Sequence, residues 1–224
     1  RSSDLDIVRE LADGRIDGLV VSVPFSSTLL MTLRDSGFPV VSLVDPQPGV
    51  PSVTVDDANG ASQIADHLHE LGHRKAVYVS SPDARIASAE KRLASFCARA
   101  QSLGIATDIA RPVDEDHRHG VVRQALANGA TALACWNDVS AYGILSQCET
   151  AGVRVPDDLS VTGFDGVPLP YGLRSDLTTI EAPWAEAARL AVLRLDAMLN
   201  GEEVPALTTL PVRLAPGVTT KQVS

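Results

Sequence analysis

The chain of 224 residues is 45% hydrophobic and 21% charged, an ordinary composition for a globular protein that can bury a substantial core. Nineteen lysines and arginines against 28 aspartates and glutamates give a formal net charge of -9, which argues against a nucleic-acid-binding surface because phosphate binding needs clustered basic side chains. Three cysteines with no CxxC pair, no apolar run of membrane-spanning length and no secretory leader together predict a protein of the reducing cytoplasm with no membrane partner.

The first third of the chain alternates amphipathic segments with short apolar runs. Helices are predicted where apolar side chains recur every three or four positions, at residues 3–12, at residues 28–35, and from Asp56 or Asp57 to Gly72. Strands are predicted from short apolar runs at residues 18–23, 39–44 and 50–55. Either aspartate can cap the third helix, and the glycine ends it.

A second series of the same kind begins after a junction near residues 72–74. Its predicted strands are residues 75–80, 131–138 and 160–166, and its predicted helices are residues 86–103, 118–128, 138–151 and 183–200. Because strands that alternate with helices form parallel sheets connected by right-handed crossovers, we expect an α/β fold with two three-layer α/β/α lobes.

Two of the predicted strands end in polar residues, at the edge of the sheet where ligands bind. In open α/β sheets the ligand lies outside the carboxyl ends of the strands. Asn137 and Asp165 fall there, and both offer hydrogen bonds rather than a nucleophile. Asp138 directly precedes a helix, so we interpret it as the N-cap of that helix. The pattern therefore predicts a small polar ligand that is bound and not chemically changed.

Arg92 and Trp136 are further candidates near these strand ends. Arg92 lies on the helix that follows the polar segment 80–83, and its planar guanidinium can grip hydroxyls or a carboxylate. Trp136 offers a flat apolar face on which a sugar ring can stack. For each residue the pattern leaves a structural alternative as open as the binding role. Arg92 can be a charge on the surface of its helix, and Trp136 can fill the core.

The motifs of other functional classes are absent from the sequence. Neither GxGxxG nor GxxxxGK[ST] occurs, so no nucleotide cofactor is expected. His67 and His69 are two apart on a helix and point to different faces, and the histidines of segment 114–119 lie in a polar loop, so no metal site is expected. Without a GxSxG motif or a histidine at a strand end, we expect no enzymatic activity.

An ordered series of longer segments resembles the effector-binding core of the lactose/purine repressor family. These segments are residues 53–61, 67–74, 92–96, 134–138 and 152–165, and residues 177–180 followed by Pro183. The resemblance covers essentially the whole chain and implies a periplasmic-binding-protein-like fold of two lobes. It implies an N-terminal lobe of residues 1–72 and 182–202, and a C-terminal lobe of residues 73–181 and 203–224 that includes an extended piece at 208–214.

The resemblance also implies which residues contact the effector. Matched position by position, Arg92, Asn137 and Asp165 fall on effector contacts of this family, in the cleft between the lobes. Trp136 and Phe25, in the loop at residues 24–27, are additional cleft candidates. Members of the family carry a helix-turn-helix, a hinge and a strand-helix-strand unit before this region, and we expect all of these to be missing here, which leaves the N-terminal lobe incomplete.

The function implied is that of the ligand-sensing and dimerisation core of a cytoplasmic transcriptional regulator, a repressor in preference to an activator. Its expected partners are a small sugar or sugar derivative, a second copy of the chain, and an operator DNA reached only through the absent helix-turn-helix. The alternative is a periplasmic sugar-binding component of a transporter, which shares the fold.

Overall fold

The computed structural model describes residues 15–22, 28–112, 115–167 and 176–223. The helix predicted at residues 3–12 and the candidate Phe25 lie outside these ranges. The chain divides into two compact units. Unit 1 is formed by the described residues up to Asp56 together with 85–88 and 183–211, and unit 2 by those of 57–84, 89–182 and 212–224. Both units are α/β, as predicted.

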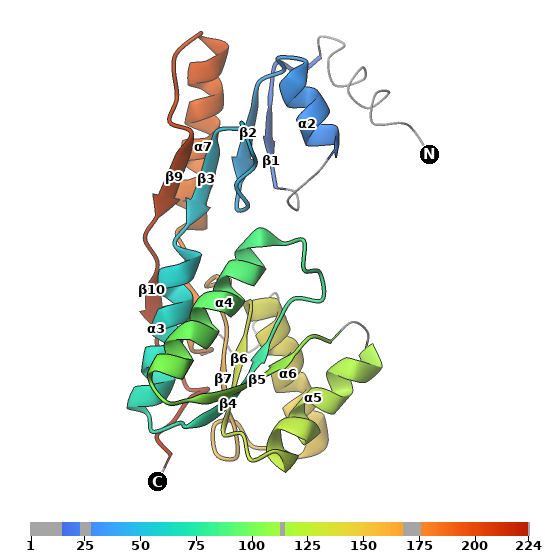
Figure 1. The fold of residues 1–224 in the computed structure, drawn as a ribbon, viewed down its shortest axis with the longest axis vertical. Helices are drawn as coiled ribbons and strands as arrows, with labels where there is room; N and C mark the ends of the chain where they lie inside the picture. Colours follow the sequence, from blue (N-terminus) through green and yellow to red (C-terminus); the bar gives the residue numbers. More distant parts are fainter. Residues whose placement is uncertain (1–14, 23–27, 113–114, 168–175, 224) are drawn as a thin grey trace. The chain divides into compact units, whose positions relative to one another are not determined.

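Unit 1 is built on a four-stranded parallel sheet with the strand order β1-β2-β3-β9 (Figure 1). Its elements are β1 (Leu19–Val21), α2 (Thr28–Asp35), β2 (Val40–Leu43), β3 (Ser52–Val55), α7 (Trp184–Leu199) and β9 (Leu207–Leu210). Val40 packs with Leu30 and Leu33 of α2, whereas its neighbour Val41 packs with Ala187 and Ala191 of α7. Because successive side chains of a strand point to opposite faces, α2 and α7 cover opposite faces of this sheet.

Unit 2 contains a second four-stranded parallel sheet with the order β5-β4-β6-β7, and a small antiparallel pair, β8 and β10. Its strands are β4 (Lys75–Val79), β5 (Ala106–Ala110), β6 (Ala132–Cys135), β7 (Ser160–Thr162), β8 (Thr179–Glu181) and β10 (Arg213–Ala215). Its helices are α3 (Asp57–Glu70), α4 (Ala87–Ser102), α5 (Glu115–Ala127) and α6 (Asp138–Ala151).

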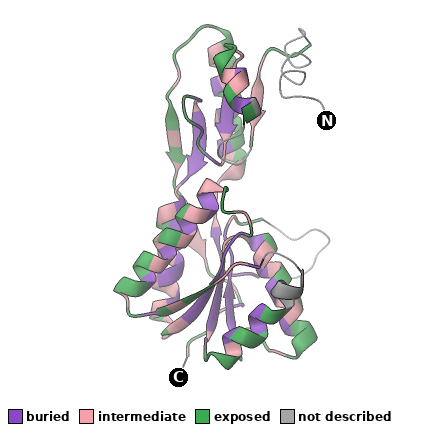
Figure 2. Cartoon of the chain, turned by 45° about the vertical axis from the view of Figure 1, so that its right-hand side comes forward, coloured by how far each residue is buried: buried purple, intermediate pink, exposed green. Residues whose placement is uncertain are grey.

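The core of unit 2 lies on both faces of this sheet. Val77 and Val79 of β4 pack with residues of α5 and α6, whereas the Tyr78 ring contacts Phe96 of α4 at 5.1 Å between centroids. These alternating contacts place α4 on one face and the pair α5 and α6 on the other. Figure 2 shows the strands β4, β6 and β7 of this sheet largely buried and the outward sides of the helices exposed. This is the three-layer arrangement predicted from the sequence.

Two segments differ from the expected arrangement. The edge strand β5 was not predicted, because two of its five residues are polar and it shows no continuous apolar run; three of its side chains are exposed in the structure. Residues 208–214 were expected as one extended piece of the C-terminal lobe. Instead β9 continues the sheet of unit 1 beside β3, and only β10 joins unit 2, antiparallel to β8. The expected lobe boundary after residue 72 also differs, since α3 packs on β8 and β10.

The last described residues complete unit 2 from a distant part of the chain. Val161 of β7 donates its backbone N–H to the Thr219 carbonyl at 2.8 Å, and Val223 donates to the Leu71 carbonyl at 2.8 Å. The side chains of His67 and Thr220 also form a hydrogen bond, at 3.0 Å. Within the described ranges, no helix combines the length and the apolarity that crossing a membrane would require.

Candidate ligand-binding site

Arg92 organises a buried ionic cluster at the carboxyl edge of the sheet of unit 2. Its side chain is only 2% exposed, and Nε donates to Oδ1 of Asp57 at 2.7 Å. Nη1 donates to the Trp136 carbonyl at 2.9 Å and lies 3.0 Å from Oδ1 of Asp165. The guanidinium carbon stands 3.7 Å from the centre of the Phe164 ring, a cation–π contact. Arg92 is therefore a buried partner of two carboxylates and not a surface charge.

Asp165 is the more accessible of the two carboxylates that face this guanidinium. Its side chain is 18% exposed, against 5% for Asp57. Burial raises the pKa of Asp165 to about 6, although the Arg92 charge opposes that shift. Its buried Oδ1 is the atom that faces Nη1 of Arg92. A carboxylate held next to a buried cation, with part of its side chain exposed, is suited to accept a hydrogen bond from a hydroxyl group of a ligand.

The backbone around this cluster has an unusual conformation at Asp165 and a close approach at Gly60. Asp165 has a φ of 112°, a region that only glycine adopts readily. Its N–H donates to the Ile180 carbonyl at 2.9 Å, and its own carbonyl accepts from Ala182 at 3.2 Å. Gly60 of α3 approaches the Phe164 ring so closely that an added Cβ would lie 2.6 Å from Cε2. These contacts fix the platform beneath Arg92.

Trp136 and Asn137 line a separate cavity of about 240 Å³ beside the start of α6. Its described lining is uncharged and includes Ser80, Val139 and Gln147. The Ser80 hydroxyl, on a residue only 1% exposed, and Oε1 of Gln147 have no hydrogen-bond partner among the described residues. The cavity therefore has an uncharged lining of mixed apolar and polar residues.

The N-cap of α6 is Asn137, which corrects the interpretation of Asp138 as the cap. Oδ1 of Asn137 accepts from the Ser140 N–H at 2.8 Å, and the backbone of Asn137 is extended with φ -154°. This bond occupies one oxygen of Asn137 and leaves its amide NH₂ as the group that can donate to a ligand. Adjacent aspartate and asparagine are equally good caps, so the sequence could not choose between them.

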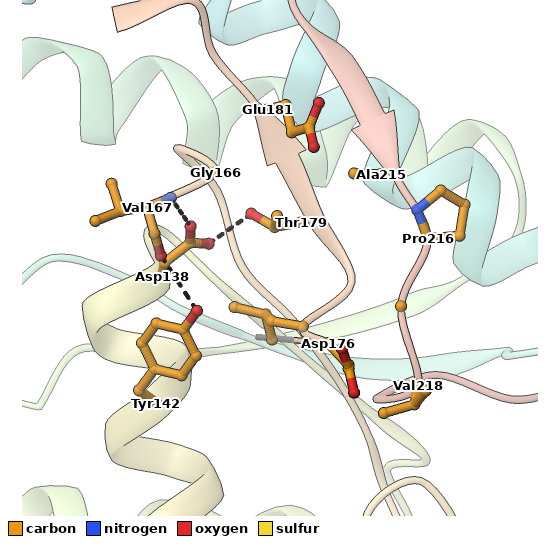
Figure 3. A pocket seen from close by; sticks show the side chains of 12 residues that line it. Asp138, Tyr142, Gly166, Val167, Asp176, Thr179, Glu181, Ala215, Pro216 and Val218 are labelled. Carbon is orange, nitrogen blue, oxygen red and sulfur yellow. Dashed lines mark hydrogen bonds between the residues drawn. The ribbon is translucent and has the colours of Figure 1, made fainter. Parts of the chain in front are cut away.

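Asp138 instead bonds outside its own helix, beside a cavity of about 590 Å³ (Figure 3). Its Oδ2 accepts from the Val167 N–H at 2.7 Å, and its Oδ1 accepts from the Thr179 hydroxyl at 2.5 Å. The side chain of Asp138 is 1% exposed, and burial raises its pKa while these hydrogen bonds oppose the shift. Tyr142 reaches the same turn, with its hydroxyl 3.2 Å from the Val167 carbonyl.

The predicted site residues thus form two groups. Arg92, Asp165 and the Trp136 carbonyl are in contact, and the Trp136 and Asn137 side chains line the neighbouring 240 Å³ cavity. Sequence reasoning missed the ionic role of Asp57, which it treated as a possible helix cap. The only available signal was the Asp56–Asp57 pair itself. The described part of the chain holds no cluster of three potential metal ligands.

Comparison with known proteins identifies the family. Residues 65–220 match the family described as "Periplasmic binding protein-like domain". The chain belongs to this family. Among curated proteins it is 29% identical over 199 residues to the HTH-type transcriptional repressor CytR of Escherichia coli K12, covering 85% of this chain and 58% of that protein. It is 31% identical over 198 residues to the HTH-type transcriptional repressor PurR of Photobacterium profundum, covering 84% and 59%.

A solved structure also resembles this chain closely. The LacI family transcriptional regulator from Enterococcus faecalis V583, with bound ribose, has a TM-score of 0.78 and 25% identity, covering 99% of this chain and 84% of that one. These relatives confirm the resemblance to the lactose/purine repressor family, and they are repressors and regulators rather than enzymes. The chain spans just under three fifths of the length of the two curated relatives.

Proposed function

We propose that this chain is the effector-binding core of a cytoplasmic transcriptional repressor, and that a small uncharged sugar-like molecule binds over Asp165 and Arg92. The observation that carries the proposal is the partly exposed Asp165 carboxylate, held 3.0 Å from an Arg92 guanidinium that is itself 2% exposed. A rigid acceptor of this kind suits a ligand hydroxyl group, which can donate to the exposed part of the carboxylate, because Oδ1 itself is buried against Arg92.

The charges of the cluster favour a neutral ligand. Arg92 faces two carboxylates, Asp57 and Asp165, so the cluster carries a net negative charge when both are ionised. That charge repels sugar phosphates and carboxylates. The uncharged cavity beside Trp136 can receive an apolar face of the same ligand, and the Asn137 amide can donate to it. The Enterococcus faecalis regulator with bound ribose supports a sugar as the ligand class.

The remaining functional features are inferred from the relatives. The two curated relatives are named HTH-type repressors, and we propose that a helix-turn-helix outside this sequence reads the operator. This division suits the net charge of -9, which makes the core itself a poor surface for DNA. We further propose that the core forms a homodimer and that the effector acts by binding one conformation of it more tightly than the other. Sedimentation of the chain tests the dimer.

Ligand binding is tested by calorimetric titration with D-ribose and a panel of other neutral pentoses and hexoses. For the sugar that binds most tightly, Asp165→Asn should weaken binding at least tenfold, because a hydrogen bond to a charged group contributes about 1.5–3 kcal/mol. The matched control Asp176→Asn removes an exposed aspartate of the same unit and should leave the affinity unchanged. Equal affinities of the parent and Asp165→Asn chains, or no binding by any sugar of the panel, would rule out the proposed site.

A further inference from the structure

Asp138 contacts the chain on both sides of Asp165. We propose that Asp138 is a positioning residue, which fixes the backbone turn that presents the Asp165 carboxylate. The geometric part of this inference stands on its own, and its significance for ligand binding rests on the proposed function.

The first line of support is the set of bonds around the turn. The backbone N–H of Asp138 donates to the Phe164 carbonyl at 2.8 Å, and Oδ2 of Asp138 accepts from the Val167 N–H at 2.7 Å. One residue therefore holds the position directly before Asp165 and the position two residues after it. Asp165 lies between them with a φ of 112°, a conformation that costs a non-glycine residue on the order of 1–3 kcal/mol. Such a conformation persists only where its surroundings impose it.

The second line of support is the connection to β8. The Thr179 hydroxyl donates to Oδ1 of Asp138, so both carboxylate oxygens are used, one on the turn and one on the strand (Figure 3). The same strand binds Asp165 directly, because the Asp165 N–H donates to the Ile180 carbonyl at 2.9 Å. Asp138 thereby couples the helix α6, the turn and β8 into one rigid support.

The packing at Gly163 shows how tightly this support is built. A Cβ at this position would lie 2.2 Å from Oδ1 of Asp138 and 2.8 Å from Cδ2 of Leu177. No real side chain tolerates these separations without movement of its neighbours. The close approach of the chain to the Asp138 carboxylate therefore depends on glycine.

An acid in the first turn of a helix often serves only the helix dipole, and this role does not account for Asp138. An acid with that role alone gains nothing from burial, whereas the side chain of Asp138 is 1% exposed and both of its oxygens bond outside α6. The cap of α6 is supplied by Asn137. The remaining role for the Asp138 carboxylate is to hold the turn.

The charged groups that face Asp165 make the arrangement measurable. Arg92 approaches from α4, Asp57 from α3 and Asp138 from α6, while Glu181 lies opposite Asp165 in the bridge to β8. The negative charge of Asp138 contributes to the raised pKa of Asp165. Neutralising Asp138 removes that repulsion and at the same time loosens the turn. Both effects can be detected without any ligand.

The test uses Asp138→Asn in the full chain, with carbon-13 NMR of the Asp165 carboxyl group across pH and amide exchange of Val167. The midpoint of the Asp165 titration should fall from about 6 by at least about half a pH unit, and Val167 exchange should accelerate by about tenfold or more. Glu149→Gln removes an exposed acid elsewhere on α6 and should change neither signal. An unchanged titration together with an unchanged Val167 exchange rate would overturn the proposal.

A second variant covers the case in which Asp138→Asn does not fold. Thr179→Val keeps the shape of the side chain but removes the hydroxyl that anchors Oδ1 of Asp138. It should also accelerate Val167 exchange, and a rate equal to that of the parent would count against the role assigned to Asp138. D-ribose titrations of the same variants separate the two proposals. Loss of protection at Val167 without any sugar binding in the parent would leave Asp138 as the anchor of the turn and reject the proposed function.

Discussion

Replacing Asp165 with asparagine should stabilise the chain at neutral pH, although it removes the central group of the proposed site. The side chain is 18% exposed, and burial raises its pKa to about 6, against about 4 for an aspartate in an unfolded chain. A difference of about two pH units corresponds to roughly 2–3 kcal/mol between the two protonation states. The ionised carboxylate of Asp165 therefore lowers the free energy of unfolding by about that amount.

The pH dependence of this effect has a definite sign. The folded chain holds the Asp165 proton more tightly than the unfolded chain, so the free energy of unfolding falls as the pH rises from about 4 to about 6. Above pH 6 the full penalty is present. Asparagine is neutral at every pH, so Asp165→Asn should be more stable than the parent by about 2–3 kcal/mol at pH 7.5 and equally stable near pH 4.

The two tryptophans of the chain make the measurement specific to unit 2. Trp136 lies in unit 2 and Trp184 in unit 1, so urea unfolding in a Trp184→Phe background follows unit 2 through Trp136 fluorescence. The control is Asp157→Asn, because the Lys221 ammonium lowers the pKa of this exposed aspartate and its pH dependence has the opposite sign. The reasoning is refuted if Asp165→Asn is less stable than the parent at pH 7.5, or if the difference is the same at both pH values.

Three further outcomes are expected. Gly60→Ala should lower the free energy of unfolding by about 1–3 kcal/mol in urea titrations, because its Cβ would lie 2.6 Å from the Phe164 ring, and an unchanged midpoint would show that the ring can yield. Asn137→Ala should lower the free energy of unfolding by about 1 kcal/mol, because the helix cap is lost. Asn137→Asp keeps a capping oxygen and should retain most of the stability of the parent, so equal losses in the two variants would exclude capping. In the native chain a thiol reagent should modify Cys97 well before the other two cysteines, because those two are buried. Mass spectrometry would contradict this prediction if it found all three cysteines modified at the same rate.

The fold could be predicted from sequence because its signals are local. Apolar spacing and terminal glycines located the helices from α3 onward to within a few residues, as at the α4 segment predicted over 86–103 and found over Ala87–Ser102. The edge strand β5 has no such signal, since only its pairing with β4 makes it a strand. The division of residues 208–214 between two sheets likewise depends on distant partners, since Arg213 pairs with Glu181, about 30 residues away, and Thr208 pairs with Val53, about 155 residues away.

The site was predictable only as far as its strand ends. Asp165 comes three residues after the end of β7, so its place at the carboxyl edge of the sheet could be predicted from the chain alone. The pairing of Arg92 with Asp57 could not, because the two residues are 35 positions apart and meet only after α3 and α4 have packed. The exchange of roles between Asn137 and Asp138 has a similar cause. Asn137 has an extended backbone and Asp138 begins the helix, and only the folded turn at Val167 decides that Asp138 is the residue that binds it.

The hydrogen bonds made by the last described residues have a consequence for biosynthesis. Val161 and Leu71 leave the ribosome well before Thr219 and Val223, the residues to which they are bonded in the folded chain. The Val161 N–H and the Leu71 carbonyl therefore lack these partners until the last described residues have been made. Unit 2 can reach its final form only when Val223 has passed the exit tunnel, so its folding is completed after nearly the whole of this sequence has been synthesised.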